Sequence, residues 1–398
     1  MLISMNPMIA IKGGRVLTIT KGVIEEGVIL IENGKIKSIG QDVKIPADAK
    51  VINAKRKVVM PGLVEAHCHI GILEETVGWY GSDGNEATEP ITPHMRAIDG
   101  IKANADEKGL EAALMTGITT AQILPGSANV IGGTGVIVKT APKVVVDEMI
   151  VKNPSGMKIA FGENPRRVYG VEFKKMPSTR MGVAALLREW LNKTLLYAEK
   201  KESATAQKDP IKMPERDPRL EALLPVVKKQ IPLRAHAHRA DDVATAVRIC
   251  EEFGLEMSWE HATEGHRIAK WLAEKKIPAV WGPSLTARGK WEMRELSFET
   301  PKTLYDAGVH FAIQTDAVGS TIAFLPICAG LACRDGLPYE EALKAITINS
   351  AEIIGVGDRV GSLERGKDAD IRILSGDPLE LKTKVEKVII NGELAWSR

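Results

Sequence analysis

The chain has 398 residues, of which 44% are apolar and 26% charged, proportions typical of a soluble globular protein. A formal net charge of +2 gives no electrostatic reason to bind nucleic acid or an anionic membrane. The four cysteines are scattered, no apolar run approaches bilayer-spanning length, and residues 1–7 lack the features of a signal peptide. These features predict a cytoplasmic protein without membrane or nucleic-acid partners.

Short strands separated by glycine and asparagine turns are predicted first, across residues 8–60. The Asn-Gly dipeptide at 33–34, between two β-rich runs, indicates a hairpin. Residues 369–391 show the same pattern of short β-rich runs, and a second Asn-Gly pair follows at 391–392. We therefore expect the two ends of the chain, 1–60 and 361–398, to form one small β-sandwich domain.

Between these ends, residues 61–360 alternate apolar strand-like runs with helical patterns such as 240–253 and 268–275. This alternation predicts a parallel sheet closed as a (β/α)₈ TIM barrel. The eight candidate strands are residues 63–70, 118–124, 135–140, 157–161, 233–238, 256–261, 279–282 and 309–315.

One segment, residues 171–230, does not fit this alternation. It is long and charged, with a helical centre at 183–200 and proline-rich flanks. We interpret it as a helical insertion that covers one face of the barrel or mediates self-association. A peripheral helical hairpin is the simpler alternative.

The sequence VEAHCH at residues 64–69 is the first sign of chemistry. Side chains alternate along a strand, so His67 and His69 project to the same side while Cys68 turns away. Two imidazoles held one pleat apart form a chelate for a divalent metal. Packed or solvated histidines are the alternative for this motif taken alone.

Later candidate strands end in further potential ligands. A second His-x-His motif provides His236 and His238, and the next strand ends in His261. Asp316 follows another strand, and Lys158 lies within an apolar run. Because active sites of barrel enzymes lie at the carboxyl ends of the strands, we expect these side chains to meet there.

These motifs resemble those of the amidohydrolase superfamily, in particular imidazolonepropionase-like and Xaa-Pro dipeptidase-like enzymes. The resemblance spans the chain and rests on MPGLVEAHCH (60–69), GITT (117–120), His236, His261, TD (315–316) and GSLERGKDAD (361–370).

The resemblance implies one or two divalent metal ions, with Zn²⁺ expected. His67, His69 and Asp316 would bind the more buried ion. His236 and His261 would bind or face the more exposed one.

Lys158 stands where related dipeptidases carry a carboxylated lysine that bridges two metals. A lysine in an apolar strand is otherwise costly to bury, and a carbamate between cations removes that cost. Glu163 is the alternative bridging group. Without a bridge, the site would hold a single metal, bound mainly by His67, His69, His236 and Asp316.

The reaction implied is hydrolysis of an amide or cyclic amide in a small substrate by a metal-activated hydroxide. Asp316 would act as general base and then general acid, and His261 or His238 would stabilise the tetrahedral intermediate. The expected class is a hydrolase of carbon–nitrogen bonds other than peptide bonds, with dipeptidase activity left open.

Relatives that share this barrel also have two other functions. A heterocycle deaminase with one metal is disfavoured by Arg239, which stands where such enzymes carry a glutamate. A non-catalytic barrel scaffold is disfavoured because this chain keeps the ligand residues.

Substrate recognition is assigned to the loops, where arginine forks suit a carboxylate. A small-molecule substrate carrying a carboxylate is therefore favoured, with pairing to local acids as the alternative. A homo-oligomer is expected by analogy with related barrels. The candidate substrate-binding residues are Arg166, Arg167, Tyr169, Arg239 and Arg288.

Overall fold

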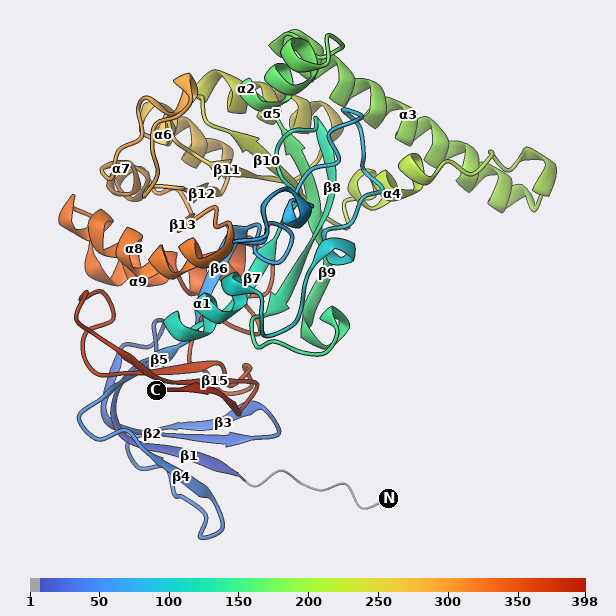
Figure 1. The fold of residues 1–398 in the computed structure, drawn as a ribbon. Helices are drawn as coiled ribbons and strands as arrows, with labels where there is room; N and C mark the ends of the chain where they lie inside the picture. The colour runs from blue at the N-terminus through green and yellow to red at the C-terminus, as the bar shows by residue number, and fades with distance from the viewer. Residues whose placement is uncertain (1–7) are drawn as a thin grey trace.

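The computed structural model describes residues 8–398. The prediction about the N-terminal segment, residues 1–7, lies outside the described residues. Two eight-stranded sheets organise the fold: one closes into a barrel, and the other lies beside it (Figure 1). Within residues 8–398, no helix is both long and apolar enough to cross a bilayer.

The barrel sheet runs in chain order from first to last strand and closes on itself. At the closure, the amide N of His69 donates to the carbonyl O of Ala317 at 2.8 Å. The strands are β6 (Leu63–Cys68), β7 (Ile118–Ile123), β8 (Ile131–Lys139), β9 (Ile150–Ala160), β10 (Leu233–Ala237), β11 (Met257–His261), β12 (Ala279–Trp281) and β13 (Phe311–Ile313).

All eight predicted barrel strands are present, but the direction expected for residues 135–140 was wrong. They belong to β8, which pairs antiparallel with both β7 and β9, whereas the other neighbouring strands are parallel. The connections flanking β8 contain no helix long enough for the crossover that parallel strands require. The barrel is therefore predominantly parallel, with one inverted strand.

Helices cover the outside of the barrel (Figure 1). The predicted helix at 240–253 is present with those bounds, and the one predicted at 268–275 begins three residues earlier. The covering helices are α1 (Lys108–Thr116), α2 (Glu163–Arg166), α5 (Ala240–Phe253), α6 (Gly265–Lys275), α7 (Thr300–Asp306), α8 (Leu325–Arg334), α9 (Tyr339–Ala345) and α10 (Ile348–Ile353).

The insertion forms α3 (Arg180–Gln207) and α4 (Pro218–Val227). The two helices pack on each other through a small apolar cluster containing Tyr197 and Leu224. The far half of α3 extends away from the barrel (Figure 1). The helical centre predicted at 183–200 is thus confirmed, in the form of a projecting helical hairpin.

The second sheet combines strands from both ends of the chain, while the β-sandwich domain expected from those ends stays a prediction. Its order is β16-β15-β14-β5-β1-β2-β3, with β4 beside β1. Both Asn-Gly turns have positive φ at both residues, as a type I′ hairpin requires. The strands are β1 (Ile9–Leu17), β2 (Val23–Glu32), β3 (Lys35–Gly40), β4 (Lys50–Asn53), β5 (Val58–Pro61), β14 (Ile371–Leu374), β15 (Val385–Ile390) and β16 (Glu393–Ser397).

Candidate metal centre

The predicted ligand side chains converge at one end of the barrel. They come from the ends of β6, β10 and β11, from within β9 and from the residues after β13. The ring centroids of His67 and His261 are 4.9 Å apart, and those of His236 and His261 are 4.3 Å apart. Groups distant in the sequence therefore share one small volume, as the strand-end argument predicts.

A carboxylate lies among the imidazoles of the first strand. Asp316 Oδ1 is 3.5 Å from His67 Nε2 and 3.2 Å from His69 Nε2. One ligand atom from each of His67, His261 and Asp316 falls within 4.8 Å of the others. This spacing suits a single cation held by two nitrogens and an oxygen.

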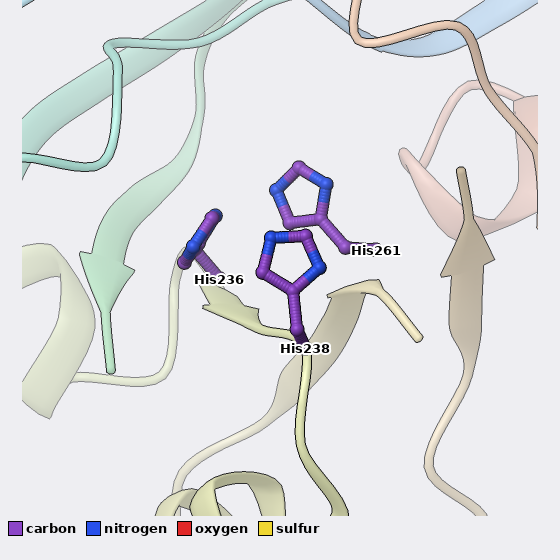
Figure 2. Close-up of side chains that lie close together, drawn as sticks. All are labelled: His236, His238 and His261. Atoms are coloured by element: carbon purple, nitrogen blue, oxygen red, sulfur yellow. The ribbon is translucent and has the colours of Figure 1, made fainter. Parts of the chain in front are cut away.

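A second group of potential ligands consists of three imidazoles, His236, His238 and His261, shown together in Figure 2. One nitrogen from each lies within 4.8 Å of the others. His238 is as close to His261 as His67 is, with centroids 4.9 Å apart. His236 and His238, two residues apart on β10, have ring centroids 5.0 Å apart and project from the same face of the strand. His261 belongs to both groups of potential ligands.

Hydrogen bonds on the outer ring nitrogens orient the imidazoles of β6. His67 Nδ1 is 2.8 Å from Glu260 Oε2, and His69 Nδ1 is 2.7 Å from the carbonyl O of Leu124. A carboxylate or carbonyl on one ring nitrogen leaves the other nitrogen free as a metal ligand. In both residues, Nε2 is the nitrogen that faces Asp316.

The buried imidazoles are electronically suited to a cation. Burial lowers the pKa of His67 to about 4 and that of His238 to about 3, and holds the pKa values of His236 and His261 well below their usual value. The rings are therefore neutral and keep a lone pair near neutral pH.

Two ring nitrogens, His236 Nδ1 and His261 Nε2, are buried without a hydrogen-bond partner within residues 8–398. Such orphaned atoms call for an occupant, because an unmade hydrogen bond in the interior is costly. A site of neutral imidazoles with a carboxylate fits a divalent cation such as Zn²⁺.

Lys158 lies inside the cluster. Its side chain is fully buried, and Nζ is 3.1 Å from His67 Nε2. Burial lowers the pKa of Lys158 to about 8, so a sizeable fraction of the amine is neutral near physiological pH. By contrast, Glu163 begins α2 and belongs to neither group of potential ligands in the described part of the chain.

The backbone adopts an uncommon conformation at two of these residues. His261 has φ of 82° and Asp316 has φ of 53°, both in the left-handed region. Non-glycine residues rarely occupy this region, and when they do in functional sites the surrounding structure imposes it. Here the turns at the ends of β11 and β13 direct the two side chains into the cluster.

The predicted substrate-binding side chains do not extend freely into the site. Arg167 pairs with Glu172 of its own loop, and Arg239 pairs with Asp241. The remaining three bond to backbone carbonyls: Arg166 to Ser178, Arg288 to Leu296 and the buried Tyr169 to Glu89. Their engagement with local groups favours the alternative, and their role in binding stays a prediction.

Sequence reasoning missed several polar residues around the centre. Glu260 is the partner of His67, and its position in an apolar strand was the available signal. Asn164 Nδ2 lies 3.3 Å from His236 Nε2. Glu292 comes from a loop after β12 and has Oε1 3.8 Å from His238 Nε2, a position that no pattern in the sequence predicts.

Comparisons with known proteins agree with this geometry. The sequence model described as the amidohydrolase family matches residues 231–395. Amidohydrolase tasK of Hapsidospora irregularis is 28% identical over 92% of this chain, which spans only 39% of the length of that protein. Imidazolonepropionase of Maricaulis maris is 26% identical, with 88% of each chain covered.

A solved structure is also similar to this chain over its whole length. An amidohydrolase from Thermotoga maritima is 45% identical to this chain, with a TM-score of 0.94, and the match covers 98% of this chain and 100% of the other. The chain therefore belongs to the amidohydrolase family, as its motifs predicted, and is similar in sequence to imidazolonepropionases.

Proposed function

We propose that this protein is a metal-dependent hydrolase that cleaves an amide or cyclic amide C–N bond in a small substrate. The observation that carries the proposal is the convergence of neutral, incompletely hydrogen-bonded imidazoles on the Asp316 carboxylate. Such an arrangement has no structural need of its own, since burying unpaired polar groups lowers stability.

His67, His69 and Asp316 would hold one divalent cation, proposed to be Zn²⁺, and His236 and His261 a second. A cation in this position lowers the pKa of water and polarises a carbonyl. Lys158 lies beside His67, where its carbamate, formed by attack of the neutral amine on CO₂ with loss of a proton, would bridge the two positions.

Asp316 is suited to move the proton. Its Oδ1 lies 3.5 Å from His67 Nε2 and 3.2 Å from His69 Nε2, beside the proposed cation, whose positive charge would keep the carboxyl group ionised. The ionised carboxylate accepts a proton from the attacking water and delivers it to the leaving nitrogen. His238, anchored by Nδ1 at 2.8 Å from Thr263 Oγ1, keeps Nε2 available to stabilise negative charge on the substrate oxygen.

The deaminase alternative gains no support from the geometry. The residue that would have to supply its carboxylate is Arg239, and this side chain is engaged with Asp241. A hydrolase of C–N bonds remains the better proposal.

Two measurements test the proposal together. Metal is quantified by elemental analysis after purification without added metal, and hydrolysis is assayed on cyclic amides, N-acyl amino acids and dipeptides before and after chelation. We expect about two equivalents of metal and chelator-sensitive hydrolysis. One equivalent would support the mononuclear site without a bridging carbamate, and no metal with no hydrolysis would favour the scaffold alternative.

The domain division and assembly remain proposals too. We propose a small domain of residues 1–60 and 361–398 attached to a barrel of residues 61–360, and self-association through the insertion at 171–230. The insertion exposes apolar side chains, with Leu196 58% and Ile211 93% accessible. Light scattering of the intact chain and of Ile211→Glu tests this, because loss of an apolar contact would shift the mass toward the monomer.

A further inference from the structure

A cavity of about 440 Å³ lies where the barrel meets the small sheet. Its walls come from the end of α1, from the turn η7 (Gly319–Phe324) and the start of α8, and from β14, β15 and β16. Helix α1 contacts both β15 and β16, so the cavity sits at the junction of the two sheets (Figure 1). It shares no lining residue with the candidate metal centre in the described part of the chain. The proposed hydrolysis therefore gives this cavity no role.

Arg372, on β14, is a buried side chain in the wall of this cavity, with only 2% of its surface accessible. Its Nη1 donates to the carbonyl O of Thr116 at 3.3 Å, and its Nη2 lies 3.1 Å from Met60 Sδ. Because Thr116 also lines the cavity, the first contact places the charged end of the side chain at the cavity wall. The Nε atom has no hydrogen-bond partner within residues 8–398. A guanidinium group has five N–H donors, so most of those of Arg372 lack an acceptor there.

Neighbouring acidic groups do not neutralise Arg372. The two acids nearest to it in the sequence, Asp368 and Asp370, both pair with Lys139. Burial lowers the pKa of Arg372 to about 9, so the guanidinium group is still charged at neutral pH. A buried charge without an ion pair lowers the stability of a fold, because nothing replaces its lost hydration. The contacts of Arg372 within the fold do not offset this cost, which an anionic ligand would.

The rest of the lining determines which anion fits. Lys384 and Arg398 are exposed cations at the edge of the cavity, against a single acidic side chain, Glu380. The positive charge attracts an anion, and the apolar walls favour one whose remaining part is apolar. Those walls include Met115, Ile327, Leu374, Leu379 and Trp396.

We propose that this cavity is a binding site for an organic carboxylate with an apolar body. The carboxylate pairs with Arg372, because a planar guanidinium group can donate to both carboxylate oxygens at once. The apolar body packs against Leu374 and Trp396 in the walls. The site is separate from the candidate metal centre, and the inference does not depend on the proposed hydrolase function.

Binding of 3-phenylpropanoate to the metal-loaded full chain tests the site. Its amide, 3-phenylpropanamide, keeps the shape without the charge, and propanoate keeps the charge without the ring. By calorimetry, we expect wild type to bind 3-phenylpropanoate about tenfold or more tightly than either of the others. A wild-type protein that does not distinguish the acid from its amide, or that binds none of the three compounds, would overturn the proposal.

Arg372→Met removes the cation and keeps an unbranched side chain in its place. This variant should lose the preference for the acid over the amide. Without ligand, its urea midpoint should be no lower than that of wild type, because an unpaired buried charge has been removed. Arg365→Met, at an exposed arginine on the loop before β14, is the matched control and should keep the preference. If Arg372→Met also keeps it, the acid binds elsewhere, for example at the metal, and the proposal is refuted.

A second variant tests the cavity without touching the cation. Ala323 lines the cavity from η7, so Ala323→Trp should fill it while Arg372 stays in place. We expect this variant to bind 3-phenylpropanoate at least tenfold more weakly, with a circular dichroism spectrum like that of wild type. Unchanged binding would place the acid outside the cavity and overturn the proposal, even if Arg372→Met failed to fold. Neither result depends on whether the protein hydrolyses an amide, so the two proposals stand or fall separately.

Discussion

Two buried polar clusters lie at opposite ends of the barrel, and they differ in how completely their atoms are paired. At the end that adjoins the small sheet, Lys139 Nζ lies 3.0 Å from Asp368 and 2.6 Å from Asp370. Arg359 and Lys35 complete the pairing of Asp368, and the amide N of Asn391 donates to Asp370. Every carboxylate oxygen there has a partner.

The cluster at the opposite end leaves atoms unpaired, among them His236 Nδ1, His261 Nε2 and Glu292 Oε1. Both clusters are buried and both are rich in charge, so burial and charge do not distinguish structure from function. What distinguishes these two clusters is how completely their carboxylate and imidazole atoms are paired. The paired cluster joins strands of the small sheet to the barrel, whereas the unpaired one is organised to receive a ligand.

The largest expected effect is that of Asp316→Asn. The amide cannot take a proton from the attacking water, so turnover should fall by about a thousandfold or more. Metal content should change little, since the amide oxygen remains a weak ligand and the imidazoles are intact. Steady-state assays and elemental analysis of the same preparation check this, and equal losses of activity and metal would contradict it.

At the paired end, Asp370→Asn should act on stability instead. Removing one partner of a buried ion pair leaves the Lys139 ammonium undercompensated, at a cost of about 3 kcal/mol in the free energy of unfolding. Urea denaturation measures this loss. Asp358→Asn, at an exposed aspartate nearby, is the control and should unfold like wild type. A stable Asp370→Asn protein with reduced metal content would contradict the comparison, in which the paired cluster supports stability and the unpaired cluster binds the ligand.

Glu260→Gln should weaken metal binding without unfolding the chain. The carboxylate opposite His67 Nδ1 orients that imidazole and increases its basicity, and loss of such a partner typically costs about 10- to 100-fold in metal affinity. Competition with a chromophoric chelator measures it. The exposed Glu256→Gln variant serves as control, and unchanged affinity in Glu260→Gln would show that His67 needs no such partner.

The smallest effect concerns acid stability. Burial raises the pKa of Asp368, but Lys139, Lys35 and Arg359 outweigh it and hold the pKa below the usual 3.8. The stabilisation is therefore fully present above that value and is lost as the pH falls through the lower folded-state pKa. The difference in urea midpoint between wild type and Asp368→Asn should therefore be smaller at pH 3 than at pH 5. A constant gap would mean that ionisation of Asp368 does not account for the difference in stability.

Much of the fold could be predicted because its signals are local. The barrel strands are short apolar runs, and α5 has helical periodicity along its length. The Asn-Gly pairs set the β2–β3 and β15–β16 hairpins of the small sheet. The inverted direction of β8 could not be predicted from periodicity, since an apolar strand reads the same in either direction.

The candidate site, like the fold, could be predicted only where its signals are local in the sequence. Alternation and strand ends were sufficient to predict that His67, His69, His261 and Asp316 lie close together. They could not separate His236 from His238, because the two side chains project from the same face. The position of Glu292 could not be predicted, since long-range packing of the loop after β12 brings it within 3.8 Å of His238. The arginine motifs could not show which local partners these side chains bond, such as Glu172 for Arg167 and Asp241 for Arg239, and their role in binding stays a prediction.

The left-handed backbone at His261 and Asp316 restricts which exchanges these positions tolerate during evolution. Among residues with side chains, asparagine, aspartate and histidine tolerate that conformation best. Glutamate or cysteine could ligate a metal equally well but would strain the chain at these points. Drift toward a different metal preference should therefore begin at His67, His69 or His236, where backbone geometry does not restrict the choice of donor.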